Sequence, residues 1–496
     1  MSGRKPRARE MLAFGVGDIY GGGAFFVIGA LFLVFLTDVA GLPASLGGLI
    51  LMVGKIWDAV TDPLMGFISD RTRSRFGRRR VYFLAGIIPV FLSFAALWLS
   101  PGGTRGARFA YYLVAYFVFN TVFTMVMIPY NALPAEMTDS YALRSRMTGV
   151  RMLFSQLGVL AGSLLARTVV AFFPTEAAGY RAMGLAFGLL FALPWILTFL
   201  GTYEREGAAP EKAARRGLGR AALAMSGEFL STLRNRSLRV HIAMYLAAYV
   251  TIDVFNALFL FYLKDYLGKG GLYQVLLGAV VLTQMASLYL VSRGCARRGN
   301  APTYRRHLAL WAAGFALFTF IGPGTPLAFM LAAAVLVGAG MSGGAMVPFN
   351  NLAFVADADE LISARRREGV YAGMMTFVRK TAQAVALFLV GLGLDALGYE
   401  SGGAAQSRAT AEGIRAMMVV APAALLAFGF FASFRFRIDP AAHRVILDSV
   451  ERLKAGAAPE ELDPDARAVC EAVTGLPAAR LWRAEPSRGT GSPFGP

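Results

Sequence analysis

Two aspartates within an apolar stretch are the first residues that could do chemistry. Asp58 and Asp62 stand four residues apart, with Thr61 beside them, so a helix would place both carboxylates on one face. Such groups are costly inside a membrane, and they usually face a cavity or pair with a cation. Their oxygen atoms suit a small hard cation such as Na+, and the pair could instead share and carry a proton. The alternative is a structural salt bridge to Lys55 or Arg151.

The surrounding chain indicates a membrane protein. Of its 496 residues, 56% are hydrophobic and 16% are charged, whereas a soluble domain averages about 25% charged residues. Apolar stretches such as FFVIGALFLVFL recur, and each approaches the ~20 residues that a helix needs to cross a bilayer. A helix satisfies its own backbone hydrogen bonds, which lipid cannot do. We therefore predict an all-α integral membrane protein.

The hydropathy pattern predicts about twelve membrane-spanning helices. They lie near 11–37, 43–69, 81–100, 109–136, 147–173, 181–202, 240–263, 272–292, 307–322, 327–355, 370–397 and 411–434.

The loops between these spans predict the orientation of the chain. Arginine-rich loops such as DRTRSRFGRRR fall on one side, which places that side and both termini in the cytoplasm. These loops account for most of the net charge of +18, so we expect the bilayer and no nucleic acid as a partner. The basic start MSGRKPRARE precedes no cleavage site and indicates a retained first helix. The expected location is the plasma membrane, the inner membrane of a bacterium.

The chain divides into two similar halves and a tail. The arginine-rich loop after the second span has a counterpart, VSRGCARRGNAPTYRRH, after the eighth. Two six-helix halves with a solute site between them at mid-membrane form the architecture of many secondary transporters. The predicted parts are an N-terminal half at 1–202, a cytoplasmic linker at 203–239, a C-terminal half at 240–437 and a cytoplasmic tail at 438–496. The segment ILDSVERLKAG in the tail has a helical pattern.

Three long motifs resemble a known transporter family. They are KIWDAVTDPLMGFISDRTRSRFGRRR, MIPYNALPAEMTDSYALRSRMTGVRM and RRREGVYAGMMTFVRKTAQAVALFLVGLGLDALGY. Together they resemble the glycoside–pentoside–hexuronide:cation symporters of the major facilitator superfamily, over about residues 10–435. The resemblance implies the major facilitator fold, with about twelve helices in two six-helix halves, and a monomer that works by alternating access.

The resemblance also implies a role for the paired aspartates. Asp58 and Asp62 match the residues that bind the coupling cation in this family, and Thr61 and Thr124 match polar positions beside it. The expected coupling cation is Na+ or H+, held by Asp58 and Asp62 as metal ligands if it is sodium. No other cofactor is expected.

Three further matches concern the transported solute. Asp18 and Arg151 match residues at the family's sugar site, and Lys380 matches a lysine that lies near both the cation and the solute sites. Asp18 could instead be a cap or another cavity-facing polar group, and Arg151 could be a counter-ion to Asp18 or Asp58. Lys380 could extend to a membrane interface, although its neighbour Arg379 suits that role better because the two must point in different directions.

Other positions depart from the family's galactoside carriers. The residues that read the sugar there are replaced in this chain by Gly17, Met127, Asn131 and Pro348, of which Asn131 is expected to line the solute site. Asp253 stands where those carriers have an asparagine, and Asn256 is three residues away, so both could face the solute. Asp253 could also carry a proton, or it could pair with another helix.

Together the residues and the resemblance predict a secondary transporter and no enzyme. The expected function is symport of a small organic solute, a sugar or glycoside, with Na+ or H+. A second interpretation keeps the cation site but changes the cargo to a lysolipid, another amphipathic solute or an organic acid. A third is a membrane sensor that binds solute without transporting it.

Overall fold

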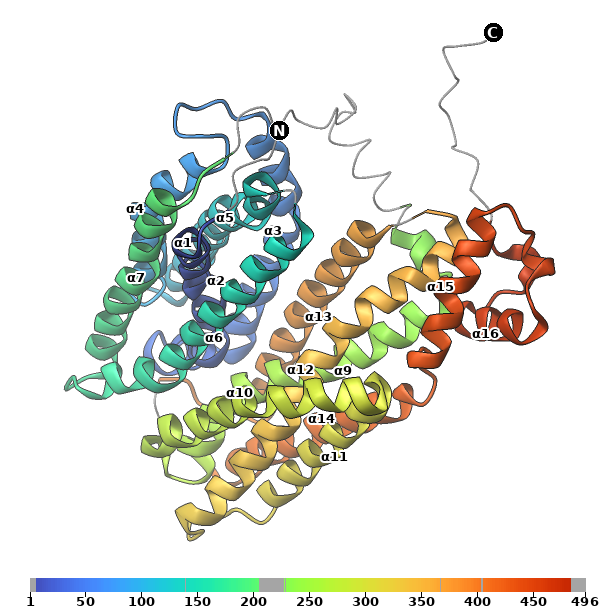
Figure 1. The fold of residues 1–496 in the computed structure, drawn as a ribbon. Helices are drawn as coiled ribbons and strands as arrows, with labels where there is room; N and C mark the ends of the chain where they lie inside the picture. The colour runs from blue at the N-terminus through green and yellow to red at the C-terminus, as the bar shows by residue number, and fades with distance from the viewer. Residues whose placement is uncertain are drawn as a thin grey trace.

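The computed structural model describes residues 6–138, 140–204, 227, 229–365, 367–402 and 405–482, which are helical with short connections (Figure 1). The first half contains α1 (Ala8–Val16), α2 (Asp18–Val27), the π-helical segments η1 (Ile28–Phe32) and η2 (Phe35–Val39), α3 (Ala44–Arg71), α4 (Arg80–Ala96), α5 (Arg105–Met137), α6 (Tyr141–Ala171) and α7 (Glu176–Gly201).

The second half repeats this plan. It contains α9 (Arg236–Phe261), η3 (Tyr262–Tyr266), η4 (Gly270–Leu272), α10 (Tyr273–Arg298), α11 (Asn300–Phe318), α12 (Leu327–Ser363), α13 (Glu368–Ala396) and α14 (Arg408–Ser433). The tail follows with α15 (Pro440–Lys454), η5 (Pro459–Glu461), α16 (Pro464–Thr474) and η6 (Ala478–Arg480).

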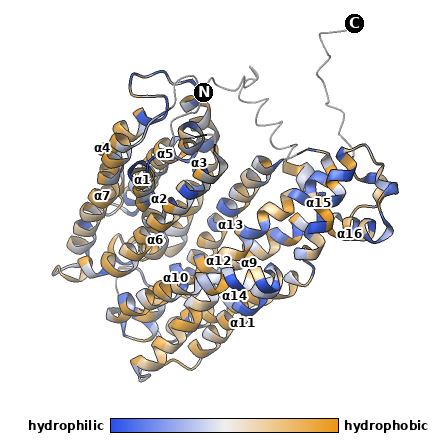
Figure 2. Ribbon diagram, viewed as in Figure 1, coloured by the Kyte–Doolittle hydropathy of each residue, from blue (hydrophilic) through white to orange (hydrophobic). Residues whose placement is uncertain are grey.

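Most of these helices are long and apolar enough to cross a membrane. Among the described residues, 10 helical segments meet that description, and α4 is a shorter apolar helix. The remaining helix, α11, carries Arg305 and Arg306 ahead of its apolar part, and it also begins earlier than the predicted 307–322. Figure 2 shows hydrophobic residues along the helices of both halves and hydrophilic ones gathered in the tail. The prediction of an all-helical membrane protein with about twelve spans is confirmed.

The first span, predicted near 11–37, is present as α1, α2 and η1, which together form one segment long and apolar enough to cross a membrane, Ala8–Phe32. Gly17 lies between α1 and α2 with helical dihedral angles (φ −59°, ψ −25°). A Cβ atom at Gly17 would lie 3.0 Å from Thr198 and 3.1 Å from Trp195 and Tyr130. The missing side chain therefore lets this part of the span pack tightly against α7 and α5.

The ends of the second half also differ from the predicted boundaries. Helix α9 begins at Arg236, inside the predicted linker, while 205–226 and 228 of that linker lie outside the described residues. The predicted tail helix is present as α15, and the tail packs on the second half. His443 Nε2 lies 2.9 Å from Asp357 Oδ2, and the Ser237 hydroxyl donates to the Val473 carbonyl (2.7 Å).

The two halves meet along α3 with α13 and α6 with α10. We call the end of the bundle at which α1 begins and α7 ends the terminus face (Figure 1), and the opposite end, which holds the contact of Asp38 with Tyr399, the far face. Near the far face, α3 and α13 cross at glycines. A Cβ atom at Gly48 would lie 3.0 Å from the backbone of Leu387 and Phe388, and one at Gly391 would collide with the Ala44 carbonyl. Small residues allow this close approach of backbones.

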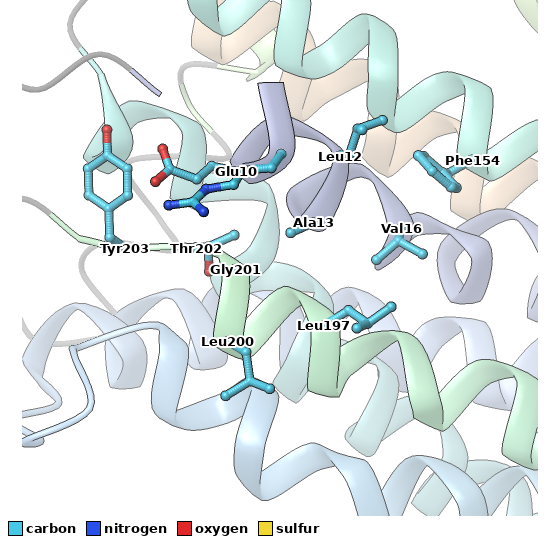
Figure 3. A pocket seen from close by; sticks show the side chains of 11 residues that line it. Glu10, Leu12, Ala13, Val16, Phe154, Leu197, Leu200, Gly201, Thr202 and Tyr203 are labelled. Atoms are coloured by element: carbon cyan, nitrogen blue, oxygen red, sulfur yellow. The ribbon is translucent and has the colours of Figure 1, made fainter. Parts of the chain in front are cut away.

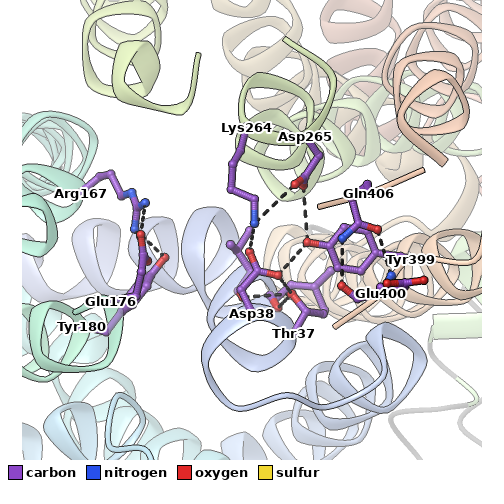
Figure 4. A network of polar contacts seen from close by, with 12 residues as sticks. Thr37, Asp38, Arg167, Glu176, Tyr180, Lys264, Asp265, Tyr399, Glu400 and Gln406 are labelled. Carbon is purple, nitrogen blue, oxygen red and sulfur yellow. Dashed lines mark hydrogen bonds and ion pairs between the residues drawn. The ribbon is translucent and has the colours of Figure 1, made fainter. Parts of the chain in front are cut away.

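Polar contacts close the far face between the halves (Figure 4). Asp38 forms an ion pair with Lys264 and accepts a hydrogen bond from the Tyr399 hydroxyl (2.7 Å). Lys264 also lies 3.5 Å from Asp265. In addition, Asp395 on α13 accepts hydrogen bonds from the first backbone N–H groups of α3, those of Ala44 (2.9 Å) and Ser45 (3.0 Å). A carboxylate at a helix N-terminus is a favourable contact, and here it joins one half to the other.

At the terminus face, the polar contacts among the described residues stay within one half. Glu204 accepts hydrogen bonds from the backbone N–H groups of Arg78, Arg79 and Arg80, at 2.7 to 2.9 Å. In the second half, Arg367 binds Asp359 through two nitrogen atoms, each at 2.7 Å. The described polar contacts therefore hold the halves together at the far face, whereas those described at the terminus face lie within each half.

The close crossing of α3 and α13 leads to a first prediction. Gly391→Leu should force the two helices apart, because the new side chain would collide with the Ala44 carbonyl. The distance between spin labels at exposed Phe172 and Phe320, in a variant without native cysteines, should then lengthen. Gly149→Leu is the matched control, because a Cβ atom there has nothing within 4 Å. An unchanged distance in Gly391→Leu, or the same change in both variants, would contradict this account of the crossing.

Candidate functional site

Asp58, Asp62 and Thr124 form the centre of the candidate site, where α3 meets α5. The Thr124 hydroxyl lies 3.0 Å from Asp58 Oδ1 and 2.9 Å from Asp62 Oδ1, so it bridges the two carboxylates. Thr61 Oγ1 donates to the Asp58 carbonyl (3.3 Å) and lies 3.4 Å from Thr124 Oγ1. The side chain of Asp58 is fully buried, whereas that of Asp62 is 22% exposed. All four residues predicted for a cation site thus lie together, and Asp62 is open to an incoming ion.

A lysine from the other half completes this group. Lys380 Nζ on α13 lies 2.8 Å from Asp58 Oδ2 and also donates to Asp62 Oδ2. Asp58 Oδ2 is buried and accepts no hydrogen bond of ordinary geometry from a described residue, so Lys380 is its nearest charge compensation. The ammonium group therefore stands between the carboxylates, and it ties the two halves together. This contact is not one of the salt bridges considered from the sequence.

Lys55 lies close to the same carboxylates without an ion pair to them. It is buried on α3, three residues before Asp58, and its Nζ atom is 3.5 Å from the centre of the Phe25 ring. A cation over an aromatic face is attracted by the electrons of the ring. Lys55 thus adds a positive charge to the group while a ring, not a carboxylate, contacts its ammonium.

Asp18 and Arg151 form a second charged pair, in the first half. Asp18 is the first residue of α2, and its Oδ2 atom lies 3.1 Å from Arg151 Nε on α6. The guanidinium group is 5.3 Å from the centre of the Tyr130 ring, which itself stacks on Phe14 at 4.6 Å. Arg151 remains 29% exposed. Of the two acids considered as its partner, the structure pairs Arg151 with Asp18.

Asp253 and Arg379 form a third pair, in the second half. The two terminal nitrogen atoms of Arg379 lie 2.7 and 2.9 Å from the two carboxylate oxygens of Asp253. Gln383, one turn further along α13, donates to Asp253 Oδ1 (2.9 Å), and the guanidinium group of Arg379 lies 4.9 Å from the centre of the Tyr249 ring. The expectation that Arg379 extends to a membrane interface is wrong, because a buried carboxylate holds it in the interior.

The two asparagines predicted for the solute site take no part in these pairs. Within the described part of the chain, neither Asn131 nor Asn256 makes a hydrogen bond through its side chain. Asn131 is exposed and follows Tyr130, whereas Asn256 is half-buried and lies three residues from Asp253. Sequence reasoning missed Gln383, although its spacing of four from Arg379 was a usable signal.

The described charged side chains of the candidate site balance one another. They comprise four acids and four bases: Asp18, Asp58, Asp62, Asp253, Lys55, Arg151, Arg379 and Lys380. A buried charge is tolerated only when it is compensated. An added cation must therefore displace one of these bases, be accompanied by an anion, or replace a proton. Lys380 is the base that already occupies the place between two carboxylates.

Comparison with known proteins agrees with this architecture. A family model described as MFS/sugar transport protein matches residues 13–440. The chain is 25% identical to a glucuronide carrier protein homolog of Escherichia coli, over 90% of this chain and 96% of that protein. It is 24% identical to a sodium-dependent lysophosphatidylcholine symporter of Danio rerio, over 83% of this chain and 82% of that one.

The fold has relatives among solved structures as well. A bacterial homologue of the human lysosomal transporter Spinster, in an inward-facing conformation, aligns with a TM-score of 0.60 at 16% identity. The alignment covers 88% of this chain and 98% of the other, which establishes a shared fold. Taken with the family match and the helix arrangement, it shows that this chain belongs to the MFS/sugar transport protein family, the glycoside–pentoside–hexuronide:cation symporters of the major facilitator superfamily.

Proposed function

We propose that this protein is a secondary transporter that couples entry of a cation, Na+ or H+, to uptake of a small organic solute, a sugar or glycoside. The observation that carries the proposal is the placing of Asp58 and Asp62, which share the Thr124 hydroxyl in the first half and bind Lys380 from the second. A cation that competes with Lys380 for these carboxylates would weaken a contact between the two halves. Cation binding and the relative movement of the halves are then linked.

The proposed cycle follows from these contacts. In the state described here, the far face is closed and Lys380 neutralises the carboxylates. A cation at Asp58 and Asp62 would take over that role and release Lys380, and it would favour the state in which the far face opens. Solute would then bind among the paired charges of Asp18, Arg151 and Asp253, and the loaded protein would return to the state open at the terminus face.

The proposed orientation places the terminus face in the cytoplasm. The arginines of the loop between α3 and α4 lie at this face, as the positive-inside rule requires. The protein would act as a monomer in the plasma membrane, with no role in catalysis. We keep the proposed division into an N-terminal half (1–202), a linker (203–239), a C-terminal half (240–437) and a tail (438–496). The one change is that α9 extends the C-terminal half back to Arg236.

The cation site is tested by removing one carboxylate charge. Asp58→Asn should abolish stimulation of solute uptake by Na+, or by an inward proton gradient, because the cation loses its buried ligand. Uptake into proteoliposomes with and without each gradient is the measurement. Asp448→Asn, at an exposed aspartate of the tail, is the matched control and should keep full stimulation. Coupled uptake that persists unchanged in Asp58→Asn would place the cation elsewhere.

The competition between Lys380 and the cation gives a second test. Lys380→Ala should raise the affinity of the protein for Na+ by about tenfold, a change of ~1.4 kcal/mol, because the competing ammonium is gone. Coupled uptake should fall in the same variant, since the link between the halves is lost. Calorimetric titration with NaCl and flux measurements report these two effects separately. Equal or weaker Na+ binding in Lys380→Ala would show that the ammonium does not compete with the cation.

The choice of cargo is a separate question within the same proposal. The relative from Danio rerio supports a lysolipid as the alternative cargo, and an organic acid also suits a site that contains Arg151. Thermal stability of the purified protein against sugars, glycosides, organic acids and lysolipids decides between them, because a ligand stabilises the folded state that binds it. Stabilisation by a lysolipid, without effect from any sugar, would replace the leading cargo. Binding without flux in proteoliposomes would indicate a sensor.

A further inference from the structure

A crevice on the outer side of the first half is separate from the charged centre (Figure 3). It has a volume of about 730 Å³ and lies between α1, α6 and the end of α7, at the terminus face. Its lining residues are Arg9, Glu10, Leu12, Ala13, Val16, Phe154, Leu197, Leu200, Gly201, Thr202 and Tyr203. A volume of this size is in the range that holds a small-molecule ligand.

The crevice is polar at one end and apolar at the other. Glu10, Thr202 and Tyr203 lie together at one end in Figure 3, whereas Val16 and Phe154 lie at the other. The apolar part is open to the surroundings of the protein. Leu12, Leu197 and Leu200 are 53%, 57% and 70% exposed, on helices that are long enough to cross a membrane. The occupant therefore has a polar head at the membrane surface and an apolar body that faces the acyl chains.

The polar end has one unused charge, and it is positive. Arg9 is exposed and has no hydrogen bond or ion pair among the described residues. The acid beside it is already engaged, because Glu10 is buried and accepts a hydrogen bond from the backbone N–H of Arg7 (2.9 Å). The hydroxyls of Thr202 and Tyr203 donate to the carbonyls of Thr198 and Met137. Arg9 is thus the group that can attract an occupant's head.

We propose that this crevice binds an anionic phospholipid from the leaflet at the terminus face. The phosphate would lie at Arg9, and an acyl chain would lie along Leu12, Val16 and Leu200. Charge complementarity favours an anionic lipid over a zwitterionic one. Basic residues beside a membrane span attract anionic lipids.

Two residues that line the crevice are close in sequence to the Asp18–Arg151 pair. Val16 lies two residues before Asp18, and Phe154 lies three residues after Arg151 on α6. The lipid would therefore press on both backbones that hold the Asp18–Arg151 pair. The lipid would help to hold Asp18 and Arg151 in position, whatever solute the protein carries.

The lipid bound to the purified protein tests the inference without any transport assay. The protein is equilibrated in detergent with equal amounts of phosphatidylglycerol and phosphatidylethanolamine, and retained lipids are counted by native mass spectrometry. We expect about a fivefold excess of phosphatidylglycerol on the unmodified chain, the effect of one basic residue at an anionic head group. Arg9→Gln should reduce this excess to the ratio in solution. Val16→Phe, which fills the apolar part, should reduce retention of both lipids.

Arg7→Gln is the matched control, because Arg7 is exposed and lies outside the lining. It should retain the excess. Equal retention of the two lipids by the unmodified chain would overturn the inference, because the crevice would then hold any surrounding lipid. A full excess in Arg9→Gln, or an equal loss in both arginine variants, would also overturn it, since the preference would arise outside the crevice.

Discussion

The ammonium of Lys380 between the carboxylates of Asp58 and Asp62 is the interaction on which the rest of the structure depends. Four charges lie together in the interior of a membrane protein, where none is tolerated without compensation. Asp58, Asp62 and Lys55 belong to α3 and Lys380 belongs to α13, so the first half lacks one positive charge, which the second half supplies. The attraction between Lys380 and the two carboxylates therefore holds the halves together. A cation bound to the carboxylates would weaken that attraction.

Other contacts also hold the halves together, and the described ones lie at the far face. Glycines let α3 and α13 approach closely near the far face, and Asp395 caps the first turn of α3 from across the joint. Asp38, Lys264 and Tyr399 close the far face beside it. At the terminus face, the corresponding polar contacts of the described residues remain within each half. The described contacts thus hold the halves together most firmly at the far face, and Lys380 lies between that end and the terminus face.

Much of this could be predicted from the sequence, because the relevant signals are local. Apolar length predicts the spans, and a spacing of four predicts that Asp58 and Asp62 share a face. Their proximity to Thr124 followed from a family resemblance, and the structure places all three in contact. What could not be predicted is which acid pairs with which base. Lys55 and Arg151 were the partners considered for the two aspartates, yet Lys380 takes that place.

Which acid pairs with which base depends on tertiary packing, and the spacing of residues along the sequence does not reveal that packing. Arg379 and Lys380 are adjacent, but α13 directs one toward Asp253 in its own half and the other across the joint.

The most direct test of this account is the chemical reactivity of Lys380. Acetylation of Lys380 can be followed by mass spectrometry and compared with acetylation of Lys454, a half-exposed lysine of the tail, as NaCl is added at constant pH and ionic strength. The account predicts that Lys380 becomes more reactive, with saturation, as Na+ displaces its ammonium from the carboxylates. For a proton-coupled protein, the same gain relative to Lys454 should appear as the pH is lowered. No change in this ratio with either cation would contradict the claim that the coupling cation and Lys380 compete for one site.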